Sequence, residues 1–155
     1  MRDFGSRLAV AFVVAGLFAG ILHAQDARAE CEFLPVASVN CPASLSPREA
    51  AFCGIWGEGY YEFDNGKLPF CLAVEISDGE TTIWYATGQH TATGGRPRYS
   101  ERKAQVKGEV LTASWPTRLP GGLIEVEYRR DGDVLRGKYK RNNRTSLVTL
   151  PRFGK

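Results

Sequence analysis

Few side chains in this chain have the type and spacing needed for acid–base or nucleophilic chemistry. Beyond the N-terminal apolar run there is one histidine, His90, in a loop rich in Gly and Thr, and no partner motif of a catalytic triad accompanies it. The pairs Glu58 with Glu62 and Glu125 with Glu127 each share one face of an expected strand, as glycosidase acids can, although solvated strands commonly carry this spacing. We therefore predict no catalytic residue, with an enzyme centred on His90 or a carboxylate pair as an alternative. Phosphate-binding, calcium and zinc motifs are absent from the sequence, so we predict no metal and no cofactor.

The other reactive side chains are four cysteines, Cys31, Cys41, Cys53 and Cys71. In an oxidising compartment an even number of cysteines is typical of disulfide bonds rather than of free thiols or thiolate nucleophiles. Four cysteines allow three pairings. Short loops favour Cys31 with Cys41 and Cys53 with Cys71, but spacing alone does not decide between the pairings.

Aromatic side chains recur on segments that we expect to be strands. In barrels such side chains line ligand pockets, where a few polar groups orient the ligand; alternatively, they fill a narrow barrel completely. We predict a site for a small apolar or aromatic ligand lined by Trp84, Tyr85, Tyr128 and Tyr139.

Charge is distributed unevenly. Residues 30–95 hold nine acidic and two basic side chains, whereas residues 96–155 hold six acidic and fifteen basic ones. If the chain closes on itself, these halves form opposite walls, and the basic wall could steer an anionic partner. Alternatively, the uneven charge is only that of a solvated surface.

The densest basic patch consists of Arg136, Lys138, Lys140, Arg141 and Arg144. Alternation places the first three on one outer face. The patch predicts an alternative function, in which a periplasmic interaction or inhibitor protein binds an acidic envelope polymer or protein. Nucleic acid is not an expected partner, because the aromatic residues of this strand point the other way.

Residues 1–29 are typical of a cleavable signal peptide. Arg2 and Arg7 precede an uncharged apolar run over residues 8–22, and small residues follow just before the expected cleavage point. A membrane-spanning helix needs about 20 apolar residues, more than this run supplies. We expect a periplasmic or secreted protein with no transmembrane segment after cleavage, and nothing in the sequence predicts its oligomeric state.

The remaining chain is expected to divide into a disulfide-stapled lead-in with a short helix, residues 30–52, and a β-barrel domain, residues 53–155. In the lead-in, Ser46 supplies a capping hydroxyl, Pro47 suits the first helical position, and Glu49 completes a capping box. A helical turn is therefore predicted from Pro47 to about Phe52.

Beyond residue 54, short segments rich in β-branched and aromatic residues alternate with turn residues such as Asp-Gly and Lys-Gly, a pattern typical of antiparallel sheets. We predict eight strands: 55–63, 70–77, 81–88, 98–107, 109–115, 123–130, 134–140 and 145–150. Each strand that alternates clearly has one apolar face, and closing the sheet buries that face and removes exposed edges. The predicted fold class is all-β, an antiparallel up-and-down eight-stranded barrel with a short N-terminal helical turn. Two stacked sheets are the alternative.

Cys53-Gly54-Ile55-Trp56 places a G-x-W motif at the entry of the first strand, after a short helical turn and before an eight-strand meander. In these features the chain resembles the calycin superfamily of lipocalins, avidins and fatty-acid-binding proteins, and it is also similar in character to small exported bacterial proteins of unassigned function. The calycin resemblance implies that Trp56 plugs one end of the barrel and that Arg152 packs across it. It also implies a non-enzymatic binding protein that carries or senses a small ligand in the barrel interior.

Overall fold

The computed structural model describes residues 31–117 and 120–153, apart from the side chains of Glu58 and Phe63. The predicted signal peptide, residues 1–29, lies outside the described residues. Among the described residues, no helix has the length and apolar character required to cross a membrane.

The predicted helical turn is helix α2, Pro47–Phe52. Ser46 Oγ accepts a hydrogen bond from the Glu49 amide at 3.3 Å, and the Glu49 carboxylate accepts one from the Ser46 amide at 3.0 Å. This reciprocal pair satisfies donors at the start of the helix that would otherwise lack partners. The predicted capping box is confirmed, and it delivers the buried ring of Phe52 to the adjacent end of the sheet.

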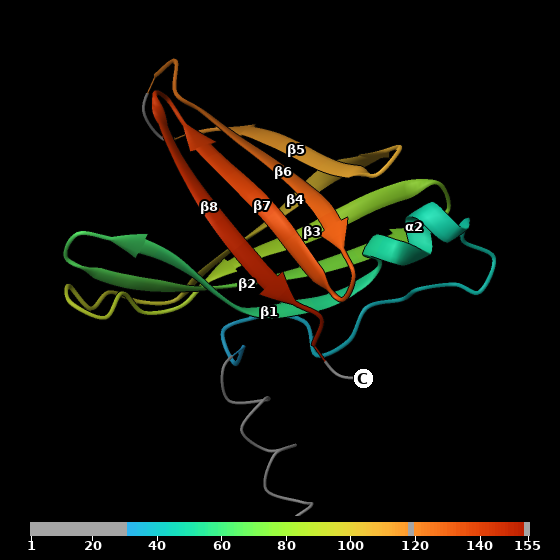
Figure 1. Ribbon diagram of the computed structural model, residues 1–155, viewed down its shortest axis with the longest axis horizontal. Coiled ribbons are helices and arrows are strands. Elements are labelled where there is room, and N and C mark those ends of the chain that lie inside the picture. Colours follow the sequence, from blue (N-terminus) through green and yellow to red (C-terminus); the bar gives the residue numbers. More distant parts are fainter. Residues whose placement is uncertain (1–30, 118–119, 154–155) are drawn as a thin grey trace, which may run out of the picture.

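After α2, the described residues form one antiparallel sheet of eight strands in which every strand pairs with its neighbours in the sequence (Figure 1). The strands are β1 (Gly54–Phe63), β2 (Gly66–Ser77), β3 (Glu80–Thr87), β4 (Arg98–Lys107), β5 (Val110–Pro116), β6 (Leu123–Asp131), β7 (Val134–Arg141) and β8 (Arg144–Pro151). At the β4–β5 and β6–β7 turns, Gly108 and Gly132 adopt φ values of 61° and 62°, which L side chains rarely adopt. The predicted fold class, an all-β antiparallel up-and-down eight-stranded barrel with a short N-terminal helical turn, is confirmed, and the barrel is nearly closed.

The barrel closes at one end and opens at the other. Next to α2, strands β1 and β8 meet through a bridge between Trp56 and Arg152 and through a 2.8 Å hydrogen bond from the Phe153 amide to the Ile55 carbonyl. Strands β4 and β5 pair only where Gln105–Lys107 face Val110–Thr112, next to their shared turn. Both seams therefore close at the same end, and the halves β1–β4 and β5–β8 diverge toward the β1–β2 and β7–β8 hairpins (Figure 1).

The side chain of Trp56 lies at the closed end and has no exposed surface. Trp56 Nε1 donates a 2.8 Å hydrogen bond to the Phe52 carbonyl. The Arg152 guanidinium lies 5.3 Å from the Trp56 ring centroid and donates to the Cys53 carbonyl at 2.7 Å. The expected pairing of Trp56 with Arg152 across the barrel end is thus present.

The lead-in is fastened to the barrel wall rather than closed on itself. The disulfides join Cys31 with Cys71 and Cys41 with Cys53, with Cα–Cα distances of 6.0 and 5.8 Å. The expected pairing of Cys31 with Cys41 and of Cys53 with Cys71 is wrong, because β2 brings Cys71, distant in sequence, beside the lead-in. The lead-in covers the outer face of β2, so that the five residues from Phe70 to Val74 are all buried. Two disulfides indicate an oxidising location outside the cytoplasm.

An irregularity in β1 decides which of two adjacent tyrosines enters the barrel. The register between β1 and β2 shifts between Trp56 and Gly59, which is the geometry of a β-bulge. The extra residue reverses the alternation, so Trp56 and Tyr61 both point inward, although they are five positions apart. Tyr61 is 3% exposed, whereas Tyr60 is 41% exposed.

Candidate ligand-binding site at the open end of the barrel

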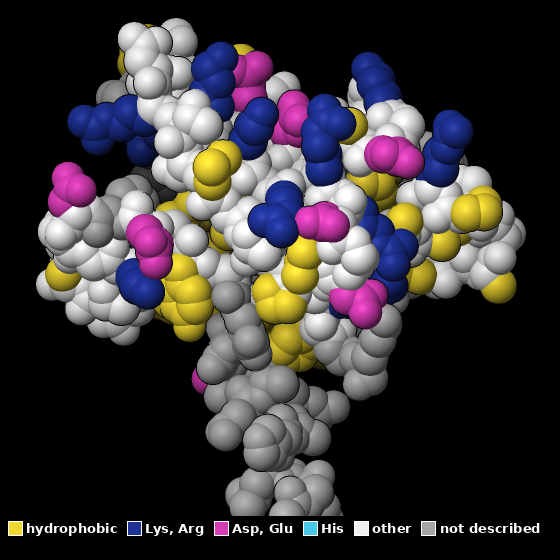
Figure 2. All heavy atoms as spheres, viewed as in Figure 1, with side chains coloured by type: hydrophobic (Ala, Val, Ile, Leu, Met, Phe, Trp, Pro, Cys, Tyr) yellow, Lys and Arg dark blue, Asp and Glu magenta, His cyan; other side chains and the backbone are white. Residues whose placement is uncertain are grey.

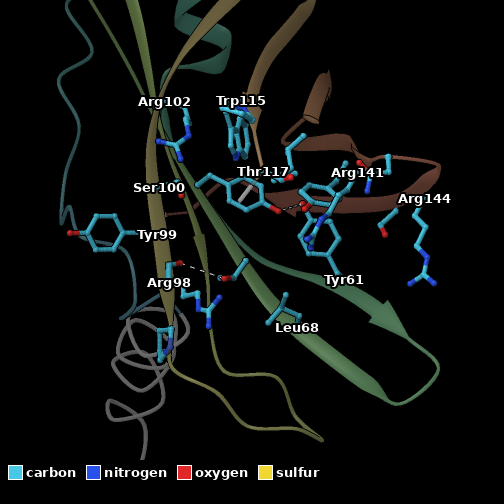
Figure 3. A pocket seen from close by; sticks show the side chains of 18 of the residues that line it. Tyr61, Leu68, Arg98, Tyr99, Ser100, Arg102, Trp115, Thr117, Arg141 and Arg144 are labelled. Carbon is cyan, nitrogen blue, oxygen red and sulfur yellow. Dashed lines mark hydrogen bonds between the residues drawn. The ribbon is translucent and has the colours of Figure 1, made fainter. Parts of the chain in front are cut away.

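A pocket of about 1130 Å³ lies between the two diverging halves of the barrel (Figure 3). We call it the mouth pocket. All eight strands contribute to it from their ends opposite Trp56, and the turn of the β7–β8 hairpin adds Asn142 and Asn143. Its volume slightly exceeds the range typical of small-molecule sites, as expected for a cleft that is open on one side.

Four aromatic side chains, which we call the aromatic floor, line the inner surface of the mouth pocket. They are Tyr61, Tyr85, Trp115 and Tyr139. Tyr85 is central: its ring centroid lies 5.4 Å from that of Trp115 and 6.0 Å from that of Tyr139, and its hydroxyl donates a 3.0 Å hydrogen bond to the Tyr61 hydroxyl. These contacts fix the orientations of the rings relative to one another, so the floor presents a joined aromatic surface.

Four arginines, which we call the mouth arginines, line the pocket above this floor: Arg98, Arg102, Arg141 and Arg144. Strand register places them on the inner face. Arg102 lies opposite the buried Ile83, and Arg141 lies opposite Ile124, which packs against the core. In β4 the alternation that buries Ala104 continues toward the open end through Arg102 and Arg98, so the inner face turns from apolar to cationic where the core ends.

Burial perturbs the ionisation of the tyrosines in and beneath the aromatic floor. Burial, together with neighbouring tyrosines, raises the pKa of Tyr61 and Tyr85 well above the ordinary value. Burial also raises the pKa of Tyr128, whose ring stacks beneath the floor 6.4 Å from Phe70. Burial also raises the pKa of Tyr139, which is less buried, and the adjacent Arg141 guanidinium favours the tyrosinate and opposes this effect. The neutral phenol is the form that this interior accommodates.

Alkaline pH should therefore destabilise the fold. The unfolded chain releases tyrosine protons near pH 10 while the folded chain retains them, so stability is fully present below about pH 10 and is lost as pH rises above it. For Tyr61, Tyr85 and Tyr128 together, the free energy of unfolding should fall by up to about 4 kcal/mol per pH unit. Urea unfolding at a series of pH values measures this slope, and Tyr61→Phe should reduce it. A stability that stays level through pH 11 would contradict the assignment.

The predicted ligand-site residues divide between the pocket and other places. Tyr85 and Tyr139 line the mouth pocket, and Tyr128 lies beneath it with no exposed surface. Trp84 follows directly after the buried Ile83 and lies opposite Ala73 and Glu101, on the outer face of the wall. Including Trp84 with Tyr85 was inconsistent with strand alternation, since adjacent residues point to opposite faces.

Tyr61, Trp115 and the arginines of β4 belong to the pocket, but the sequence prediction omitted them. Trp115 was recognisable as an inward residue, since it alternates with Leu111 and Ala113. Arg98 and Arg102 could have been found by continuing the inward alternation of β4 back from Val106. Tyr61 carried only the weak signal of two glycines, Gly57 and Gly59, around the bulge.

The predicted basic patch also divides between two faces. Arg141 and Arg144 line the mouth pocket. Arg136, Lys138 and Lys140 lie exposed on the outer face of β7. The face of the molecule seen in Figure 2 carries basic and acidic side chains interspersed with one another. Arg136 pairs with Asp131 at 2.7 Å, Lys140 pairs with Glu125 at 3.2 Å, and Lys138 lies opposite Glu127 in the β6–β7 register.

Of the candidate catalytic residues, His90, Glu62, Glu125 and Glu127 do not line the mouth pocket, and the side chain of Glu58 lies outside the described part of the chain. His90 Nδ1 accepts hydrogen bonds from the amides of Ala92 and Thr93, both at 3.2 Å, and so orders its own loop. The carboxylates of Glu125 and Glu127 form ion pairs with basic neighbours on the outer surface. Within the part of the chain that the structure describes, no three His, Cys, Asp or Glu side chains come together in a way that could hold a metal ion.

Fold and site together define a class of protein: a disulfide-stapled, nearly closed antiparallel barrel with an aromatic pocket at its open end. No protein-family model and no curated protein sequence matches this chain.

Proposed function

We propose that this chain is a calycin-like, periplasmic or secreted binding protein that carries or senses a small ligand in the mouth pocket. The observation that carries the proposal is the aromatic floor, a continuous set of ring faces at the bottom of a cavity of about 1130 Å³. Apolar and aromatic surfaces of this kind bind small molecules, while a few polar groups orient them. The bridge between Trp56 and Arg152 at the closed end supports the calycin resemblance.

The alternative function, binding of an acidic polymer or protein through the outer basic patch, has less support. Arg136 and Lys140 already pair with carboxylates on the same surface. An incoming anion would have to displace Asp131 and Glu125, and solvent-exposed charges of this kind contribute little free energy individually. The mouth arginines, by contrast, form no ion pair among the described residues, which favours the small-molecule proposal.

Replacing one member of the aromatic floor tests the proposal. Trp115→Leu should weaken binding of the neutral aromatic probe N-phenyl-1-naphthylamine by about tenfold, because it removes a ring face from the pocket. Titration of the protein into the probe, followed by probe fluorescence, measures the dissociation constant.

Trp84→Leu is the matched control, because Trp84 lies on the outer face of the neighbouring β3 wall. Its dissociation constant should stay within about twofold of the parent value. If the parent protein binds neither this probe nor its sulfonated analogue 8-anilinonaphthalene-1-sulfonate, or if both leucine variants weaken binding equally, the mouth pocket is not the binding site and the proposal fails.

A further inference from the structure

The mouth arginines approach the pocket from both halves of the barrel. Arg98 and Arg102 belong to β4, and Arg141 and Arg144 flank the β7–β8 turn. Figure 3 shows Arg102 beside Trp115 on one wall and Arg141 near Tyr61 on the other, with Tyr99 on the far side of β4. A ligand that rests on the aromatic floor would therefore have guanidinium groups on both sides of its outer end.

Arg102 is the most constrained of the four. Its guanidinium lies 5.5 Å from the Trp115 ring centroid, and one terminal nitrogen donates to the Glu101 carbonyl at 2.7 Å. Its Nε is buried and has no hydrogen-bond partner in the described structure. A buried donor without a partner costs free energy, and a bound acceptor would remove that cost.

The positive charge of the mouth pocket is not neutralised locally. Among the described residues, no aspartate or glutamate lines the pocket, and none of the mouth arginines forms an ion pair. On the outside of the barrel the opposite holds, since Lys67, Lys103 and Arg129 each pair with a carboxylate. The mouth arginines are therefore available to a ligand, whereas these outer cations neutralise carboxylates on the barrel surface.

Resting on the proposed function, we infer that the ligand is an amphipathic acid: an aromatic or apolar body that packs on the aromatic floor, with an oxyanion held by the mouth arginines. The planar guanidinium donates paired hydrogen bonds that match carboxylate, sulfonate and phosphate oxygens. The low-dielectric floor beneath strengthens these bonds. A neutral ligand of the same shape would leave the positive charge of the mouth arginines uncompensated, so the site discriminates in favour of the acid.

Two fluorescent probes with one aromatic body separate this inference from the proposed function. They are N-phenyl-1-naphthylamine, which is neutral, and 8-anilinonaphthalene-1-sulfonate, which adds the oxyanion. At low salt the sulfonate should bind at least about tenfold more tightly, because hydrogen bonds to charged groups discriminate by this factor or more. Adding salt should reduce this advantage and leave the binding of the neutral probe unchanged.

Variants then locate the oxyanion. Arg102→Gln should weaken binding of the sulfonate about tenfold and change that of the naphthylamine less than about twofold. The double variant Arg141→Gln with Arg144→Gln, at two exposed positions, should do the same and carries the test if Arg102→Gln fails to fold. Arg136→Gln is the control, because Arg136 pairs with Asp131 outside the pocket, and it should change neither affinity.

Displacement of the sulfonate probe by 2-naphthoate, by 1-naphthyl phosphate and by 2-naphthol identifies the head group. Stronger displacement by one of the two acids than by the alcohol supports the inference and names the preferred oxyanion. Equal binding of the neutral and sulfonated probes, equal displacement by alcohol and acids, or an unchanged sulfonate affinity in the arginine variants overturns it and leaves the proposed function standing. Failure of both probes to bind overturns both.

Discussion

Trp56→Ala is expected to lower the free energy of unfolding by about 4 kcal/mol, the range measured when a large buried aromatic side chain is truncated. Trp56 has no exposed surface, and the substitution also removes the hydrogen bond to the Phe52 carbonyl and the ring beneath Arg152. The closed end is where β1 and β8 meet, so the cavity would open at the junction that completes the barrel. Urea unfolding followed by circular dichroism measures the change.

Trp84→Ala provides the comparison for this variant. Trp84 is only half-buried on the outer face of β3, so its removal should cost about 1 kcal/mol. A similar loss from the two variants would mean that Trp56 does not close the barrel. If the substitution changes mainly the slope of the unfolding free energy against urea concentration, it has instead altered the denatured state.

Removal of one disulfide by Cys31→Ser with Cys71→Ser should cost about 4 kcal/mol, because the bond constrains a long loop of the unfolded chain. The two cysteines are separated by 40 positions. In the folded state the same bond holds the lead-in over the outer face of β2, where Cys71 and Ala73 are buried. Loss of the tether would therefore also expose apolar surface of β2. Urea unfolding under non-reducing conditions measures the difference from the parent.

The second disulfide supplies the control. Cys41 and Cys53 are separated by 12 positions, so their replacement by serine should cost about 3 kcal/mol. Peptide mapping of the parent protein without reduction should recover a fragment that links Cys31 to Cys71. A fragment linking Cys31 to Cys41 would contradict the pairing. A larger loss of unfolding free energy on removal of the Cys41–Cys53 bond than of the Cys31–Cys71 bond would contradict stabilisation by constraint of the unfolded chain.

Local features were predictable from the sequence because their causes lie within a few residues. Ser46 and Glu49 satisfy backbone donors of the same helical turn. Turn glycines such as Gly108 and Gly132 mark the hairpins, and the alternation of Leu111, Ala113 and Trp115 identifies an inner face. Strand number, strand order and fold class follow from these signals, since a meander with one apolar face has few ways to bury it.

Part of the candidate site was also accessible from the sequence. Tyr85 and Tyr139 were expected at a ligand site and line the mouth pocket. The amino acids of the basic patch were noted as well, but Arg141 and Arg144 lie on the inner face, whereas Arg136 and Lys140 lie outside and are paired. A run of like charges specifies composition, whereas the strand register decides which member faces which environment.

The four cysteines, which were predicted to form two disulfides in the oxidising compartment that the signal peptide indicates, illustrate how far the sequence alone determines this protein. It determines the elements and the amphipathic faces, because these depend on near neighbours in the chain. Tertiary structure alone decides that Cys71 reaches Cys31, that a bulge turns Tyr61 inward in place of Tyr60, and that β4 separates from β5 beyond Gln105. The separation of β4 from β5 opens the pocket that Arg102 and Arg144 share. Pairing between distant segments depends on how the whole sheet closes, and no local sequence pattern encodes that.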